Sequence, residues 1–271
     1  MEYVSAQDIT LPALGFGTAR MDDYETQRRA IDVAIETGYR HLDTAQSYGS
    51  EQAVGDAVRE SGIDRAEFWL TTKLAGGNRD YDRVLSSTEA SLERLGTDYL
   101  DLLLIHHPND TVPHEETLRA MNELHDDGLV RQLGVSNFSI DQCNAAIEAS
   151  PAPILTNQVK YHARHRQDAL LTWCLAHDVL LTAYSPLAIG DLLSDSTLQA
   201  MGESYGKTVA QVAIRWLVEQ PHVLTIPMSS SPSHIRENFD VFDFELSSAD
   251  RRVIYDLEGG IDDELAATLD V

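Results

Sequence analysis

Four side chains of the sequence could together move a proton. They supply a carboxylate, a phenol, an ammonium group and an imidazole, and they are Asp43, Tyr48, Lys73 and His106. A tyrosine has a pKa of about 10, too high to protonate a carbonyl oxygen quickly at neutral pH. A lysine beside Tyr48 would lower this pKa by favouring the phenolate, and Asp43 would hold the lysine charged. His106 could donate a hydrogen bond to the same carbonyl oxygen. These residue types predict the delivery of a proton to a carbonyl group.

Other kinds of chemistry can be weighed against this one. The four side chains contain no electron source, so a reduction would need a bound nicotinamide as hydride donor. No usual serine or cysteine nucleophile arrangement accompanies them. A metal hydrolase would use Asp and His ligands, but His106 and His107 are neighbours on a predicted strand and should point to opposite faces. The first strand also has no His-x-His pair. We therefore expect no metal.

The elements that must position these residues alternate along the chain. Eight apolar or β-branched runs predict strands at 14–18, 40–43, 69–73, 102–106, 132–136, 154–159, 179–184 and 223–227. Between them, apolar residues recur with helical spacing in 28–37, 81–95, 117–127 and 209–219. Eight strands alternating with helices predict a (β/α)8 TIM barrel, with 1–271 as a single domain. An open doubly wound sheet is the alternative, but Gly15-Phe-Gly17 does not continue into its Gly-x-Gly-x-x-Gly fingerprint.

Local signals support the predicted helices. Ser139 with Gln142, and Thr208 with Gln211, match the capping box that begins a helix ahead of an apolar run. We therefore expect helices to begin directly after these two hydroxyl residues.

Polar residues end seven of the eight predicted strands. They are Asp43, Lys73, His106, Ser136 with Asn137, Gln158, Tyr184 and, just beyond its strand, Ser229. In a parallel barrel the carboxyl ends of all strands open on one face, so these side chains should meet at one mouth. A cap, a snorkelling lysine or a core hydrogen bond could explain each residue alone. The repetition at the same end of seven strands favours a functional site.

The charge of the chain excludes several partners. Forty-four acidic residues against twenty basic ones leave a net charge of −24, and lysine occurs only at positions 73, 160 and 207. Such a field opposes nucleic acid and anionic membranes, since phosphate binding needs clustered Lys and Arg. Low salt would leave this self-repulsion unscreened. The chain could be an ordinary acidic protein, but the depletion of lysine favours a halophilic protein adapted to concentrated salt. We expect a small-molecule partner and a monomer.

The sequence gives no sign of a secretory or membrane protein. The first residues show no signal-peptide pattern, and no apolar run approaches the roughly 18 residues needed to span a bilayer. Cys143 and Cys174 form no Cys-x-x-Cys and are expected to be buried as small hydrophobes. These features predict a cytoplasmic protein.

Several segments together resemble the aldo-keto reductase family, in order and at the spacings of that family. They are 38–51, 72–74, 99–106, 133–138, 157–162, 183–187 and 226–238. The resemblance extends from about Gly15 to Leu257 and implies the (β/α)8 barrel. It also implies an oxidoreductase that reduces aldehydes or ketones with NAD(P)H, in which Tyr48 donates the proton and Asp43, Lys73 and His106 complete the catalytic tetrad.

The same resemblance implies a set of cofactor contacts. Ser136, Asn137 and Gln158 would bind the nicotinamide carboxamide, and Tyr184 would stack on the ring. The remaining positions are Ser185 and Leu187 at the pyrophosphate, Ser229, His234, Glu237 and Asn238 at the adenosine end, and Gly17, Thr18, Asp43 and Ile226 elsewhere along the cofactor.

The chain departs from the family pattern in three places. Met228 and His234 stand where many NADP-dependent members have a lysine and an arginine that hold the 2′-phosphate. NADP(H) is implied by the resemblance, but NAD(H) or dual use becomes credible. Ala19 and His107 replace aromatic residues of the substrate pocket, which predicts a wider and wetter site. The tail 258–271 is short, which predicts an open pocket for polar aldehydes, ketones or sugar-derived carbonyls.

A second class of function stays open on the sequence. Some members of this family are cofactor-binding regulatory or structural proteins, and some of these retain the tetrad. Enzyme and regulator would share every residue named above, so turnover of a carbonyl substrate is the property that separates them.

Overall fold

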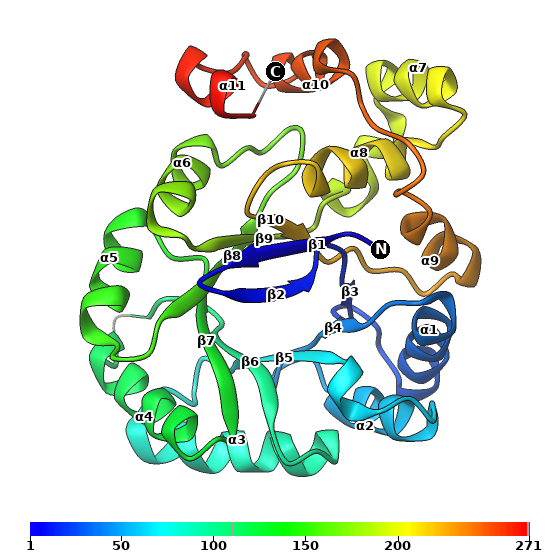
Figure 1. The fold of residues 1–271 in the computed structure, drawn as a ribbon. Coiled ribbons are helices and arrows are strands. Elements are labelled where there is room, and N and C mark those ends of the chain that lie inside the picture. Colours follow the sequence, from blue (N-terminus) through cyan, green and yellow to red (C-terminus); the bar gives the residue numbers. More distant parts are fainter. Residues whose placement is uncertain (110, 270) are drawn as a thin grey trace.

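The computed structural model describes residues 1–109, 111–269 and 271. Its main sheet has eight parallel strands in the order β10-β9-β8-β7-β6-β5-β4-β3 (Figure 1). They are β3 (Phe16–Gly17), β4 (His41–Asp43), β5 (Trp69–Leu74), β6 (Leu100–Ile105), β7 (Val130–Ser136), β8 (Ile154–Lys160), β9 (Leu180–Tyr184) and β10 (Val223–Thr225). Leu14 forms a parallel bridge with Thr225, and the Gly15 N–H donates to the Thr225 carbonyl at 2.8 Å. These contacts join the two edges of the sheet. The predicted barrel is confirmed.

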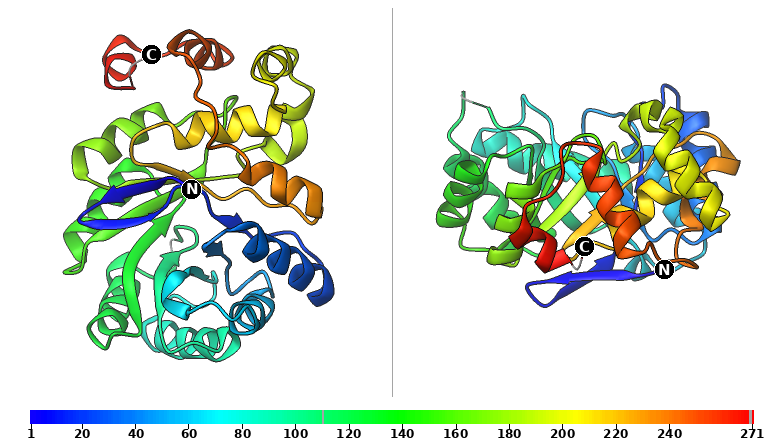
Figure 2. Two further views of the ribbon diagram at one scale, coloured as in Figure 1. Left: turned by 45° about the vertical axis from the view of Figure 1, so that its right-hand side comes forward. Right: turned by 90° about the horizontal axis from the view of Figure 1, so that it is seen from above.

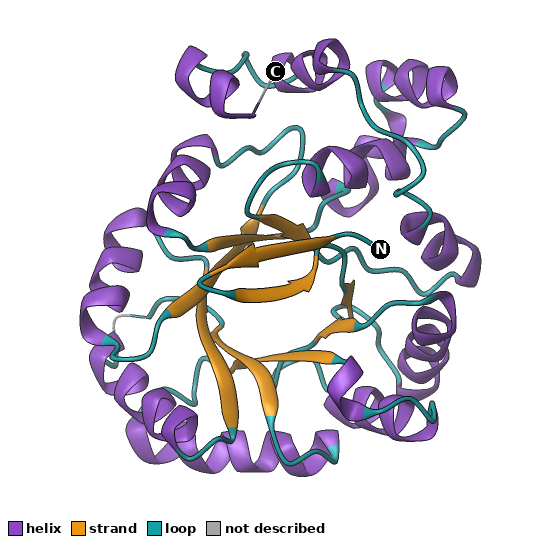
Figure 3. Cartoon of the chain, viewed as in Figure 1, coloured by secondary structure: helices purple, strands orange, loops and turns teal. Residues whose placement is uncertain are grey.

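Helices surround the strands, as Figures 1 and 3 show. They are α1 (Tyr24–Thr37), α2 (Glu51–Glu60), α3 (Tyr81–Leu95), α4 (His114–Asp126), α5 (Ile140–Ala149), α6 (Asp168–His177), α8 (Val209–Val218) and α9 (Pro232–Phe239). Outside this ring lie α7 (Ser196–Tyr205), α10 (Ser248–Asp256) and α11 (Asp263–Leu269), in the upper part of Figure 1. Short 3-10 turns occupy η1 (Arg65–Glu67) and η2 (Ala188–Ser194).

Local chemistry places the helix starts where the sequence predicted them. The Ser139 side chain accepts from the Gln142 N–H, and Thr208 accepts from Gln211 in the same way, so both capping boxes are confirmed. The predicted helix 81–95 coincides with α3, which ends at Gly96 in the left-handed conformation that glycine adopts most easily.

A two-stranded hairpin closes one end of the barrel. Strands β1 (Tyr3–Ala6) and β2 (Ile9–Pro12) pair antiparallel. Ala6 and Leu11 pack with Leu155, Leu180 and Leu224, which lie near the N-terminal ends of their strands. Figure 2 shows the hairpin lying across this end. The opposite end, where the strands finish, is left for the functional residues.

The remaining sequence features have simple structural counterparts. Cys143 and Cys174 are buried and unpaired by disulfide, as predicted, and burial raises the pKa of the Cys143 thiol to about 12. Among the helices that the structure describes, none is both long and apolar enough to cross a membrane.

Candidate active site

The four predicted catalytic side chains meet at the mouth of the barrel. Asp43 is the last residue of β4, Lys73 lies near the end of β5, and His106 directly follows β6. Lys73 is fully buried, and its Nζ donates to Asp43 Oδ1 and, at 2.8 Å, to the Thr44 carbonyl. Tyr48 lies in the loop before α2, and its hydroxyl is 3.3 Å from His106 Nε2. The distance from Lys73 Nζ to the centre of the Tyr48 ring is 5.2 Å.

The net shift of the Tyr48 pKa in the protein alone is upward, opposite to the predicted lowering. Burial raises the pKa of Tyr48, Asp43 raises it further, and Arg20 opposes the rise. Burial is the largest of these effects, because it disfavours the charged phenolate. Burial also lowers the pKa of Lys73, and Asp43 opposes that change. Tyr48 is therefore a neutral phenol, the form that holds a proton to donate.

His106 is held in its uncharged form. Burial lowers its pKa to about 3, and the positive charges of Lys73 and Arg79 act in the same direction. An imidazole without a net charge can donate a hydrogen bond from Nε2 if its proton sits there, and Nε2 is the atom that faces Tyr48.

The predicted orientation of His106 and His107 is wrong. Their rings stack with centroids 4.5 Å apart and planes 14° apart, so both point the same way. Strand β6 ends at Ile105 and the chain bends at His107, so the alternation of a strand does not reach these residues. Even so, the described residues contain no group of three His, Cys, Asp or Glu side chains arranged to hold a metal ion.

Residues at the ends of β7, β8 and β9 are bonded to this group. Gln158 Nε2 donates to Asp43 Oδ2 at 2.8 Å, and Ser136 Oγ donates to the Gln158 carbonyl at 2.7 Å. Asn137 Nδ2 donates to the His106 carbonyl at 3.0 Å, and the Tyr184 hydroxyl donates to Asn137 Oδ1 at 2.9 Å. The amide and hydroxyl side chains predicted at the strand ends are therefore part of one polar network.

A cavity of about 670 Å³ opens over this network. Most of the predicted site residues line it: Gly17, Ala19, Asp43, Tyr48, His106, His107, Ser136, Asn137, Gln158, Tyr184, Ser185, Leu187, Ile226, Ser229, His234, Glu237 and Asn238. Two predicted site residues, Lys73 and Thr18, do not line the cavity. Lys73 is covered by Asp43 and Tyr48, and buried Thr18 donates to the Asp43 carbonyl at 3.1 Å.

The donor set fits an extended dinucleotide. Gly17 lines the cavity and lies so close to the Ile226 carbonyl that a Cβ would be 2.8 Å from its oxygen, so glycine is required there. At the far end, the cavity reaches His234 in the first turn of α9, and a helix N-terminus attracts phosphate. Between these points the lining offers hydroxyls and amides rather than carboxylates, apart from Asp43 and Glu237.

The sequence prediction missed one side of this cavity. Arg20, with φ of 62°, and Ile189, Gly190 and Leu193 of η2 also line it. Ile189 has φ of 58°, an unfavourable conformation for a β-branched residue, and its side chain is 66% exposed. Neither a positive φ nor a loop that folds back over the mouth leaves a periodic signal in the sequence.

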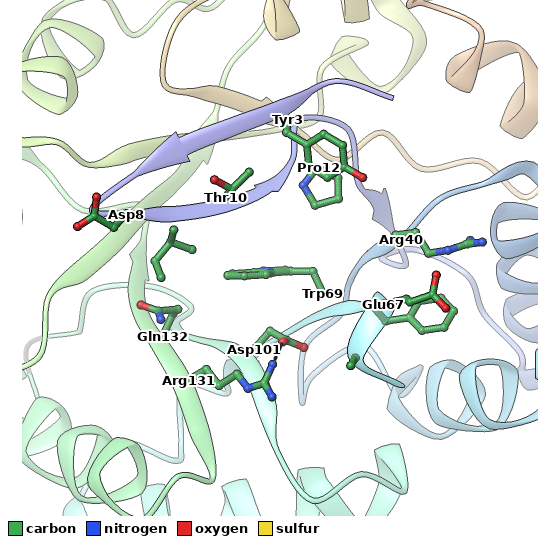
Figure 4. Close-up of a pocket in the computed structure, with 13 residues that line it drawn as sticks. Tyr3, Asp8, Thr10, Pro12, Arg40, Glu67, Trp69, Asp101, Arg131 and Gln132 are labelled. Carbon is green, nitrogen blue, oxygen red and sulfur yellow. Dashed lines mark hydrogen bonds and ion pairs between the residues drawn. The ribbon is translucent and has the colours of Figure 1, made fainter. Parts of the chain in front are cut away.

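A second cavity, of about 520 Å³, lies at the opposite end of the barrel beside the hairpin (Figure 4). Trp69, Asp101 and Arg131 are among its lining residues. Arg131 pairs with Asp101 at 3.4 Å, and Asp101 also accepts from Arg65 at 2.7 Å. None of the predicted site residues lines this cavity, so the candidate active site is the one at the mouth.

Comparison with known proteins agrees with this geometry. The model of the Aldo/keto reductase family matches residues 13–257. A glyoxal reductase of Bacillus subtilis is 38% identical over 242 residues, which cover 89% of this chain and 87% of that protein.

Solved structures share the same fold. An aldo/keto reductase of Brucella melitensis is 39% identical with a TM-score of 0.89, and the match covers 95% of this chain and 99% of that one. An aldo-keto reductase of Bombyx mori, solved in complex with NADP, is 31% identical with a TM-score of 0.89, covering 98% of this chain and 96% of that one. The chain belongs to the aldo/keto reductase family and is an NAD(P)H-dependent carbonyl reductase.

Proposed function

We propose that Tyr48 is the proton donor of this reductase and that His106 positions the substrate. The observation that supports this is the 3.3 Å contact between the Tyr48 hydroxyl and His106 Nε2 at the floor of the cavity. A carbonyl oxygen placed between these two groups would receive a hydrogen bond from each. Reduced nicotinamide, when bound, supplies the hydride to the carbonyl carbon. Tyr48 gives its proton to the oxygen, and the product is an alcohol.

We propose that Lys73 and Asp43 act on the phenolate that forms when Tyr48 loses its proton. When Tyr48 gives up its proton it becomes a phenolate, and the Lys73 ammonium lies 5.2 Å from its ring centre. In a buried site this charge acts on the phenolate more strongly than the same charge would across water. Asp43 keeps Lys73 charged despite burial, and Gln158 holds the second oxygen of Asp43. The ammonium therefore offsets part of the cost of forming a buried phenolate, while the resting phenol stays neutral.

The test is the variant Tyr48→Phe, which keeps the ring and removes the proton. With a simple aldehyde, kcat should fall by about 10²- to 10⁴-fold, the usual contribution of a general acid. Binding of NADPH, followed by quenching of protein fluorescence, should be retained. Full activity in the variant would overturn the role of Tyr48. Tight cofactor binding without turnover of any carbonyl by the wild type would instead favour a regulatory protein.

We propose a weakened preference for NADPH over NADH. Met228 and His234 line the adenosine end of the cavity, where two permanent cations would otherwise contact the 2′-phosphate. Arg236 is not among the lining residues; it is exposed and donates to the Pro232 carbonyl. Each charge-assisted contact contributes about 1.5–3 kcal/mol. We expect Met228→Lys to raise the NADPH to NADH ratio of kcat/KM about tenfold. A wild-type ratio above about 100 would contradict the weakened preference.

We also propose an open pocket that admits polar aldehydes, ketones and sugar-derived carbonyls. In the described part of the chain, the lining residues end at Asn238, so α10 and α11 leave the cavity uncovered. Leu265 and Leu269 of α11 instead pack into the main core with Tyr255. The same packing supports 1–271 as one domain. A net charge of −24 further supports adaptation to concentrated salt.

A further inference from the structure

His107 has a defined tautomer because Asn137 has a defined orientation. A carbonyl oxygen can only accept, so the atom 3.0 Å from the His106 carbonyl must be the Asn137 amide nitrogen. The Tyr184 hydroxyl at Asn137 Oδ1 agrees with this assignment. Ser136 Oγ, also 3.0 Å from that nitrogen, uses its own proton on the Gln158 carbonyl and therefore accepts. The amide nitrogen of Asn137 thus faces acceptors.

One of those acceptors is His107. Its Nδ1 lies 3.0 Å from Asn137 Nδ2, and two donors cannot face each other at that distance. Nδ1 therefore carries the lone pair, and it shares the two amide protons of Asn137 with the His106 carbonyl and Ser136 Oγ. Burial lowers the pKa of His107, and the charges of Arg79 and Lys73 lower it further, so the ring is neutral near pH 7. In a neutral ring with a bare Nδ1, the proton sits on Nε2, at the edge away from Asn137.

Arg79 holds the main chain of the same residue. Its side chain is only 2% exposed, and Nη2 donates to the His107 carbonyl. The main chain of Arg79 is fixed in turn, because Thr117 Oγ1 of α4 donates to its carbonyl at 2.6 Å. Arg79 therefore anchors the bend after β6 that stacks the His107 ring on His106.

The stacking places the two imidazoles side by side on the cavity wall. His106 faces Tyr48. The centroid of the His107 ring lies 4.5 Å from the centroid of the His106 ring, and His107 also lines the cavity. We propose that His107 is a specificity-determining residue whose Nε2–H binds an acceptor oxygen on the carbon next to the reacting carbonyl, with Arg79 as the residue that positions it. The favoured substrates are 1,2-dicarbonyl and 2-hydroxycarbonyl compounds. The inference rests on the proposed function, since Tyr48 and His106 define where the reacting carbonyl lies.

The tautomer is tested without any substrate. The ¹⁵N chemical shifts of labelled histidine distinguish a protonated from an unprotonated ring nitrogen, and His107→Phe identifies which signals belong to this residue. At neutral pH, His107 should show a bare Nδ1 and a protonated Nε2. In Arg79→Met, loss of the anchor and of the buried charge should mix the two tautomers, and Arg79→Lys should restore the single form in part. A protonated Nδ1 in the wild type would overturn the proposal.

The specificity is tested with methylglyoxal and propanal, which differ in the second oxygen. The measured quantity is the ratio of kcat/KM for methylglyoxal to kcat/KM for propanal, so the intrinsic reactivity of each aldehyde cancels between variants. In His107→Phe, which keeps a flat ring and removes the donor, the ratio should fall about three- to tenfold, as for loss of one hydrogen bond between neutral groups. His107→Gln, which keeps an N–H donor, should recover part of it.

The control is the same histidine-to-phenylalanine substitution at a position outside the site. His177 stacks on Trp173 outside the site, at 4.3 Å between ring centroids, so His177→Phe should leave the ratio unchanged. An unchanged ratio in His107→Phe, with both aldehydes still reduced by the wild type, would overturn the role of His107 and leave the proposed function standing. Turnover of neither aldehyde by the wild type would refute both.

Discussion

The two ends of the barrel each hold a cavity, and the charged groups at the two ends are arranged differently. At the N-terminal end, the buried Asp101 joins the partly exposed Arg65 and the exposed Arg131, whose guanidinium groups lie 4.1 and 3.7 Å from the centre of the Tyr99 ring between them. At the mouth, one ion pair, Lys73 with Asp43, is fully buried, and the neighbouring phenol and imidazoles are kept neutral. The Asp101 group at the N-terminal end links neighbouring segments of the chain. The Lys73–Asp43 pair at the mouth keeps one positive charge beside the hydroxyl proton of Tyr48.

The largest expected effect comes from removing one cation at each end. Lys73→Met should lower kcat by about 10²-fold or more, because the phenolate of Tyr48 loses its stabilising charge. It should also cost about 3–5 kcal/mol of unfolding free energy, since Asp43 stays buried without its partner. Arg65→Met should cost about 1–3 kcal/mol through loss of its bonds to Asp101, with kcat nearly unchanged. Denaturant titration and steady-state kinetics measure the two quantities.

Asp43→Asn is the partner control at the mouth. It removes the carboxylate that keeps Lys73 charged, so it should also lower kcat. If Arg65→Met reduced kcat per folded molecule as strongly as Lys73→Met, the contrast between the two ends would be lost.

Salt should change the interactions among exposed charges much more than the buried ion pair at the mouth. Raising KCl from about 0.01 to 1 M shortens the screening length from about 30 to 3 Å, which weakens repulsion among the exposed acids. We expect Tm to rise by about 10 °C, as for about 3 kcal/mol in a domain of this size. The buried Lys73–Asp43 pair is screened much less, so the loss of kcat in Lys73→Met should be similar at both salt concentrations. A flat dependence of Tm on salt would contradict adaptation to concentrated salt.

Two histidines, His41 in β4 and His106 at the mouth, should make the stability of the fold depend on pH. Burial lowers the pKa of His41, in the first position of β4, to about 4, and that of His106 to about 3. Both values lie below the ordinary 6.5, so the unfolded chain binds more protons than the folded one between these limits. Stability is then full above pH 6.5 and falls as the pH decreases toward 4. We expect a loss of about 1–3 kcal/mol between pH 7 and pH 5.

Two variants assign this loss. His41→Gln should flatten the fall of stability in denaturant titrations, and its profile of kcat against pH should match the wild type. His106→Gln should reduce kcat at every pH. An inflection of the wild-type kcat near pH 6.5 that disappears in His106→Gln would show that His106 titrates normally and would contradict its lowered pKa.

The fold was predictable where burial imposes a pattern on the sequence. Strand β6 is buried along its whole length and reads as an almost unbroken apolar run, apart from Asp101. The capping boxes at Ser139 and Thr208 were equally clear. The hairpin β1–β2 was missed because its turn consists of Gln7 and Asp8, both at positive φ, in place of the Asn-Gly or Asp-Gly that usually marks such a turn.

The residues of the site were predictable from strand ends, and their electrostatics were not. Asp43, Lys73 and His106 follow from the rule that parallel strands finish on one face. The raised pKa of Tyr48 depends on burial and on the nearby Asp43 charge, and neither follows from the spacing of residues in the sequence. The stacked rings of His106 and His107 depend on where β6 stops, and strand ends are the least certain part of any prediction.

The contact between β3 and β10 affects how the barrel closes when the chain is synthesised. The first and last strands of the barrel meet there, where the Gly17 N–H donates to the Pro227 carbonyl at 3.0 Å, and Gly17 and Ile226 form part of the cavity floor. During synthesis, the edge of β3 must wait without its partner until nearly the whole protein has left the ribosome. The floor of the cofactor cavity therefore cannot form before β10 and Pro227 have been made. A dinucleotide bound across this floor would hold the beginning and the end of the barrel together, so its arrival should complete maturation and slow reopening.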